Sequence, residues 1–151
     1  MGKYEVKKIY NLLEFELDTL VKESKQDGFR FLERLVNDYE AGSNAFNNFG
    51  EGLFAVFNEE GVIIAIGGLN KDPYSNEKSI GRLRRFYVSK EYRRKGVGSL
   101  LVNKIIDEAK KYYEILVLHT DTGQADKFYT SLGFSKENLY PNSSHYMAFI
   151  S

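Results

Sequence analysis

The chain has 151 residues, of which 42% are hydrophobic and 28% are charged, a balance typical of a globular protein rather than a disordered one. Its 21 Lys and Arg residues equal its 21 Asp and Glu residues, so no basic excess indicates a nucleic-acid-binding protein. Cysteine is absent, which excludes disulfides, thiolate metal sites and a cysteine nucleophile.

No N-terminal stretch resembles a signal peptide, and no apolar run approaches the ~20 residues of a membrane helix. We therefore expect one domain over residues 1–151, cytoplasmic, with no membrane or nucleic-acid partner and no metal. Hydrophobic periodicity predicts the elements of the first half. They are an opening strand at 3–9, helices within 12–21 and 29–39, a loop at 42–52, and a hairpin of strands 53–57 and 62–69 with Gly61 at its turn.

The second half alternates strands and helices. Asp121 and Gln124 are spaced as a capping box, or Thr122 is itself the N-cap of the last helix. The predicted elements are a loop at 71–79, strand 80–88, a helix from 97 to about 111, strand 114–120, a helix ending at Gly133, and strand 146–150. This order predicts an α/β (α+β) fold, with a central mixed β-sheet of about six to seven strands flanked by about four helices.

The stretch RRKGVGS, residues 93–99, lies between the strand at 80–88 and the following helix. Glycines at a helix start cost conformational entropy, while the free amides and dipole of that helix favour an anion. Neither a Walker A string nor a dinucleotide fingerprint is present, because position 101 is Leu101 where the fingerprint needs a third glycine. The stretch alone fits either an anion site or a solvated basic turn.

Two motifs together resemble a known family. The pattern Arg/Gln-x-x-Gly-x-Gly/Ala is present at residues 93–98, and TGQADKFYTSLGF, about thirty residues later, is similar to Ala-x-x-Phe/Leu-Tyr-x-x-Leu-Gly-Phe. In this order and spacing they resemble the GNAT superfamily of N-acetyltransferases, most closely over residues 80–135. The resemblance implies acetyl-CoA or another acyl-CoA as the acyl donor and an amine, on a small molecule or a protein, as the acceptor.

The resemblance also implies residue roles. The CoA diphosphate would lie on the amides of residues 94–99, and the pantetheine arm would pair like an added strand with Phe86 and Val88. The Phe86 N–H would polarise the thioester carbonyl, and the Tyr129 hydroxyl would protonate the departing thiolate. By spacing alone, Tyr129 fits a packing aromatic as well. The implied cofactor set is Phe86, Val88, Arg93, Arg94, Lys95, Gly96, Val97, Gly98, Ser99 and Thr122.

The sequence departs from the family at the general base. Many members carry a glutamate where Arg82 stands, so the proton acceptor is either His119 at a strand end, a loop carboxylate, or ordered water. Arg82 and Arg84 either bind an anionic acceptor or face solvent on the sheet. The loop carboxylates considered are Glu51, Asp72 and Asp121.

Three functions are consistent with these residues. The first is an acyl-CoA-dependent N-acyltransferase (acetyltransferase) in which the amine attacks the thioester directly in a ternary complex. A covalent intermediate is not expected, because the chain has no cysteine that could form one. The alternative is a catalytically weak CoA-binding regulatory module, and the third is a nucleic-acid patch over residues 82–95. The sequence does not identify the acceptor, the acyl-chain preference or the oligomeric state, a homodimer being one option.

Overall fold

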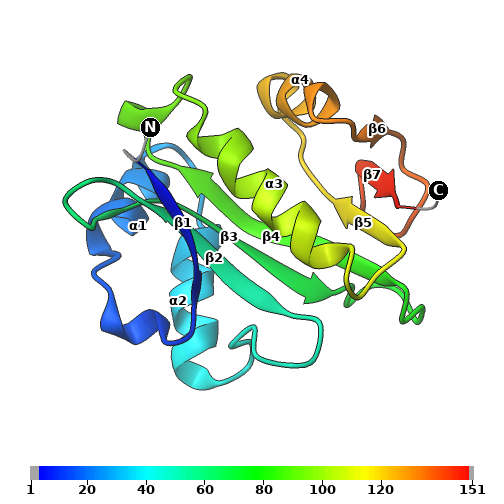
Figure 1. Ribbon diagram of the computed structural model, residues 1–151, viewed down its shortest axis with the longest axis horizontal. Coiled ribbons are helices and arrows are strands. Elements are labelled where there is room, and N and C mark those ends of the chain that lie inside the picture. Colours follow the sequence, from blue (N-terminus) through cyan, green and yellow to red (C-terminus); the bar gives the residue numbers. More distant parts are fainter. Residues whose placement is uncertain (1–3, 150–151) are drawn as a thin grey trace.

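A seven-stranded mixed sheet, in the order β1-β2-β3-β4-β5-β7-β6, forms the centre of the molecule (Figure 1). The computed structural model describes residues 4–149. The predicted opening and closing strands also include Lys3 and Ile150, which lie outside the described residues. The elements are β1 (Glu5–Ile9), the 3-10 helix η1 (Leu12–Glu14), α1 (Asp18–Gln26), α2 (Phe31–Ala41), β2 (Gly52–Phe57), β3 (Ile63–Lys71), β4 (Ile80–Val88), the 3-10 helix η2 (Lys90–Tyr92), α3 (Val97–Ala109), β5 (Ile115–Leu118), α4 (Gly123–Ser131), β6 (Ser135–Lys136) and β7 (His145–Ala148).

The predicted fold class is confirmed, and the differences are local. The first predicted helix is broken: the Asn11 side chain caps η1, the chain is extended at Phe15, and α1 begins at Asp18. The N-cap of α4 is Thr122, whose hydroxyl accepts a hydrogen bond from the Ala125 N–H at 3.1 Å. Within residues 4–149, no helix combines the length and apolarity needed to cross a membrane.

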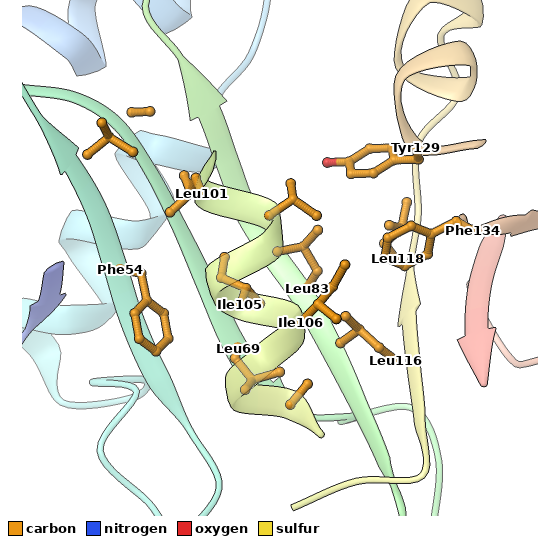
Figure 2. Packing of buried hydrophobic residues seen from close by; sticks show 14 of the residues in the cluster. Phe54, Leu69, Leu83, Leu101, Ile105, Ile106, Leu116, Leu118, Tyr129 and Phe134 are labelled. Atoms are coloured by element: carbon orange, nitrogen blue, oxygen red, sulfur yellow. The ribbon is translucent and has the colours of Figure 1, made fainter. Parts of the chain in front are cut away.

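The sheet is covered on both faces, with α3 on one side and α1 and α2 on the other (Figure 1). Strand β2 shows how its sequence serves both layers, because successive side chains point to opposite faces. Phe54, labelled in Figure 2, and Val56 pack in the α3 layer. Leu53, Ala55 and Phe57 pack in the α1–α2 layer. A continuous apolar strand is therefore required here.

Neighbouring strands are antiparallel throughout the described sheet except β4 and β5, which are parallel and connected through α3. Their pairing is short: Ile80, Gly81 and Arg82 of β4 lie opposite β5, and β4 then continues to Val88 without a described strand on that side. The two strands thus part within the sheet.

A β-bulge interrupts the other edge of β4. Gly68 lies opposite Arg84, and Ile66 lies opposite Tyr87. Two β4 residues, Arg85 and Phe86, therefore face the single β3 residue Gly67. Arg85 has a positive φ of 58°, an uncommon conformation for a residue with a side chain. The bulge shifts the alternation of side chains along β4.

Candidate functional site

A cleft of about 980 Å³ follows the parting of β4 and β5. Its walls come from β4, the start of α3, the turn after β5, α4 and the segment between α1 and α2. Two predicted cofactor residues lie outside the lining: Val97 is buried in the α3 core, and the Lys95 ammonium lies 5.5 Å from the centre of the Tyr92 ring. The eight that line the cleft are Phe86, Val88, Arg93, Arg94, Gly96, Gly98, Ser99 and Thr122.

The glycine turn leaves backbone donors at the mouth of the cleft. Gly96 is the N-cap of α3 with φ 80° and provides no side-chain cap. The first amide hydrogen bond back to it comes from Leu100, so the amides of residues 97–99 have no partner within the helix. No atom lies within 4 Å of a Cβ built at Gly96, and an anion can therefore approach the backbone there.

Gly98 is glycine for an additional reason. A Cβ at this position would lie 3.1 Å from Cζ of Phe128 and 3.5 Å from Cγ2 of Val88. The absence of a side chain at Gly98 therefore allows α3 to lie close to the Phe128 ring of α4. Any side chain here must displace that ring or project into the cleft.

Arg93 is tied to the protein rather than free in the cleft. Its Nε donates to the Val88 carbonyl at 3.0 Å, and its Nη2 donates to Oδ2 of Asp27 at 2.9 Å. It thereby fastens the basic turn to the end of α1. The Arg94 side chain is exposed at the cleft and forms no ion pair with any residue from 4 to 149, so it remains available to a phosphate.

Glu23 on α1, which the sequence gave no reason to single out, holds the end of β4. Its carboxylate accepts hydrogen bonds from the Tyr87 hydroxyl at 2.8 Å, the Ser89 hydroxyl at 3.1 Å and the Lys90 N–H at 2.8 Å. Partial burial alone would raise the pKa of Glu23, but these bonds and the charge of Arg93 outweigh it and lower the pKa.

We expect Glu23→Gln to destabilise the protein by about 1–2 kcal/mol at neutral pH, because a charge-assisted acceptor becomes a neutral amide. A carboxyl whose folded pKa lies below its unfolded value stabilises the fold above the unfolded pKa, and this contribution is lost as pH falls through the folded pKa. As the pH falls from neutral to below ~4.5, the free energy of unfolding of the mutant should therefore decrease less than that of wild type. Urea unfolding at several pH values measures this, with the exposed Glu60→Gln as control. Parallel pH profiles for Glu23→Gln and wild type would contradict it.

Tyr129 lies on α4 with its hydroxyl facing the cleft. Figure 2 shows the hydroxyl pointing away from α4 toward α3 and β4, and within residues 4–149 no group hydrogen-bonds to it. The ring packs against Phe86 at 6.0 Å and Phe128 at 5.0 Å between centroids. Burial raises the pKa of Tyr129, so its hydroxyl is a protonated donor over the ordinary pH range.

The proposed proton acceptors fall into two groups. His119 and Asp121 follow β5 and line the cleft, exposed. Glu51 and Asp72 do not line it: the Glu51 carboxylate accepts the Lys71 N–H at 3.2 Å, and Asp72 is 1% exposed. Of the four candidates, His119 and Asp121 are therefore the two that line the cleft.

Arg82 is buried, which contradicts the interpretation that it faces solvent on the sheet. It is 4% exposed, and its Nε donates to Oδ1 of Asp72 at 2.7 Å. Its two Nη groups donate to the carbonyls of Pro141 and Asn142, each at 2.9 Å, and the Tyr74 ring lies 4.7 Å from the guanidinium carbon. These contacts hold the 137–144 segment over the cleft.

His145 is a second residue that the sequence gave no reason to single out. Its buried ring bonds Oδ1 of Asp126 at 2.8 Å through Nε2 and the Ser144 hydroxyl at 2.7 Å through Nδ1. That hydroxyl oxygen also accepts the Thr120 N–H at 2.9 Å. The chain of contacts ties α4, β7 and the turn after β5 together, and so fixes the wall that carries Tyr129.

Comparisons with known proteins show a matching family and similar folds. The chain matches the model of the acetyltransferase (GNAT) family over residues 9–134. A proposed acetyltransferase from Exiguobacterium sp. 255-15 is 30% identical, with a TM-score of 0.86 over 96% of this chain and 93% of that one. A GNAT-family acetyltransferase from Staphylococcus aureus Mu50 is 20% identical, with a TM-score of 0.74 over 97% and 99% of the two chains. Glucosamine-6-phosphate N-acetyltransferase from Arabidopsis thaliana is 17% identical, with a TM-score of 0.62 over 92% and 96%.

Proposed function

The chain belongs to the acetyltransferase (GNAT) family, and we propose that it transfers an acetyl group from acetyl-CoA to a primary amine. The observation that carries the proposal is the cleft where β4 and β5 part, which runs to the free amides at the start of α3. A thioester arm with a diphosphate at one end matches this combination of an unpaired strand edge and an anion site.

The backbone of β4 supports the proposed placement of the arm. The Ser89 N–H donates to Ile64 on β3, so by alternation the N–H groups of Phe86 and Val88 point to the opposite side, into the cleft. The Val88 carbonyl already accepts a hydrogen bond from Arg93. The two N–H groups are the donors that this part of β4 directs into the cleft. In this proposal the Phe86 N–H bonds the thioester carbonyl and stabilises the negative charge that develops on its oxygen.

The reaction needs one bond formed and one broken. The neutral amine attacks the thioester carbon, the C–N bond forms as the C–S bond breaks, and the amine proton passes to His119, Asp121 or water. The Tyr129 hydroxyl donates to the departing sulfur. Because a thiol has a pKa of ~8.5 and burial raises the pKa of Tyr129, this hydroxyl stabilises the thiolate mainly by hydrogen bonding.

We expect Tyr129→Phe to lower kcat for acetyl transfer about 10–100-fold, since one charge-assisted hydrogen bond to the leaving group is lost. The KM for acetyl-CoA should change little. Protein stability should be unchanged or slightly higher, because no described residue bonds the hydroxyl. Steady-state release of CoA with a panel of primary amines, together with thermal unfolding, measures both effects.

Phe128→Leu is the matched control, because it alters the same aromatic cluster without removing a hydroxyl. Unchanged kcat in Tyr129→Phe would exclude the proposed role of the hydroxyl. Tight acetyl-CoA binding with no CoA release from any amine would instead favour the CoA-binding regulatory module.

A further inference from the structure

The bulge in β4 places two arginines side by side on one face. Leu83 packs in the α3 layer, so alternation puts Arg84 on the face of α1 and α2. Arg85 would return to the α3 face in a regular strand, yet its guanidinium lies 3.6 Å from Oδ2 of Asp38 on α2. Phe86 then packs again in the α3 layer. Two consecutive cations therefore share one wall of the cleft.

These two cations are poorly neutralised. Only 14% of the Arg85 side chain is exposed, whereas its partner carboxylate on Asp38 is 40% exposed and 3.6 Å away. Burial, and then repulsion by Arg84, lower the pKa of the Arg85 guanidinium more than Asp38 raises it. The Arg84 side chain forms no ion pair within residues 4–149. Bringing two guanidinium groups together under partial burial is unfavourable unless an anion joins them.

The other arginines of the cleft have their own partners, so the positive charge of Arg84 and Arg85 is not fully compensated. Arg82 is matched by Asp72 and Arg93 by Asp27. Arg94 lies at the glycine turn, where the proposed diphosphate binds, so Arg84 has no counterion among the described residues and Arg85 has the partly exposed Asp38 carboxylate. Aromatic side chains line the same cleft, from the segment before α2, from the first residue of α2 and from the β3–β4 loop: Phe29, Phe31 and Tyr74.

We propose that Arg84 and Arg85 bind a carboxylate or phosphate group of the acceptor, so that the substrates of this enzyme are anionic primary amines. The inference rests on the proposed function and specifies its substrate class. Both groups offer oxygen pairs that guanidinium donors bind in a forked geometry, and the aromatic side chains would contact the apolar part of the molecule. The acyl transfer itself is unchanged.

The test compares matched acceptors that differ in the anionic group. The pairs are phenylalanine with phenylalanine amide, for a carboxylate, and phosphoethanolamine with ethanolamine, for a phosphate. CoA release is measured for wild type, Arg84→Met, Arg85→Met and the control Lys78→Met, which removes an exposed cation outside the cleft lining. Calorimetric titration of the same four compounds into CoA-saturated protein measures binding independently of turnover.

We expect at least one anionic compound to exceed its neutral partner about tenfold or more in kcat/KM or in affinity. Arg84→Met and Arg85→Met should each reduce that ratio severalfold, with acetyl-CoA binding retained, and Lys78→Met should leave it unchanged. The compound pair that shows this preference identifies the bound group as a carboxylate or a phosphate. Equal use or equal binding of both partners, or no binding of either anion to CoA-saturated protein, overturns the inference. Failure to bind acetyl-CoA at all would instead overturn the proposed function.

Discussion

Gly98→Glu is expected to abolish measurable acetyl-CoA binding, with a loss of affinity of at least a hundredfold. The new side chain starts 3.1 Å from the Phe128 ring and must enter the cleft where the diphosphate would lie on the first amides of α3. Its carboxylate adds repulsion of about 4 kcal/mol for one phosphate charge at ~4 Å and an effective dielectric constant of ~20. Isothermal titration with acetyl-CoA and with CoA measures the loss.

Gly98→Gln separates charge from bulk in this experiment, because it has nearly the same shape as Gly98→Glu and no charge. We expect it to weaken binding clearly less than the glutamate. Circular dichroism and thermal unfolding check that both variants fold despite the contact with Phe128. If Gly98→Glu folds and binds CoA as wild type does, the diphosphate does not lie at this turn.

Arg82→Met is expected to destabilise the protein by about 3–5 kcal/mol, because it leaves the buried Asp72 carboxylate without its cation. Oδ2 of Asp72 already has no hydrogen-bond partner among the described residues, so the remaining anion would be still less compensated. Two carbonyls, of Pro141 and Asn142, would also lose their donors. Urea unfolding followed by circular dichroism gives the free-energy difference.

Arg84→Met is the matched control, since it removes the same charge from the same strand where no described ion pair exists. It should change stability by no more than about 0.5 kcal/mol. The double variant Arg82→Met with Asp72→Leu should recover part of the loss, because neither buried charge remains. A loss below 1 kcal/mol in Arg82→Met would show that the buried pair with Asp72 does not stabilise the fold in this way.

Much of the fold was predictable because its elements carry strong periodic signals. Strand β4 coincides with the predicted residues 80–88, and α3 begins at Val97 as expected. In contrast, β6 has two exposed residues, Ser135 and Lys136, and no periodicity can mark a strand so short. The break between η1 and α1 depends on the backbone at Phe15, while the apolar pattern continues through it.

The candidate site was predictable where residues close in sequence act together, as in the glycine turn. It was not predictable where distant residues meet. Arg82 hydrogen-bonds to Asp72 across the β3–β4 connection, and His145 hydrogen-bonds to Asp126, nineteen positions away. Glu23 reaches the end of β4 from α1, 67 positions before Lys90. A sequence shows each of these charges, but the pairing follows from the packed fold.

The short pairing of β4 with β5 also bears on the stability of the whole sheet. Three residue pairs join β4 to β5, so the sheet is continuous but has few backbone hydrogen bonds between its two halves. An arm that bonds β4 and contacts α4 would act there as an additional strand. Its binding energy would then appear as folding energy of the liganded state, growing with the logarithm of ligand concentration above Kd. In this proposal the co-substrate would be a removable structural element, and the protein would lose part of its stabilisation each time the CoA product leaves.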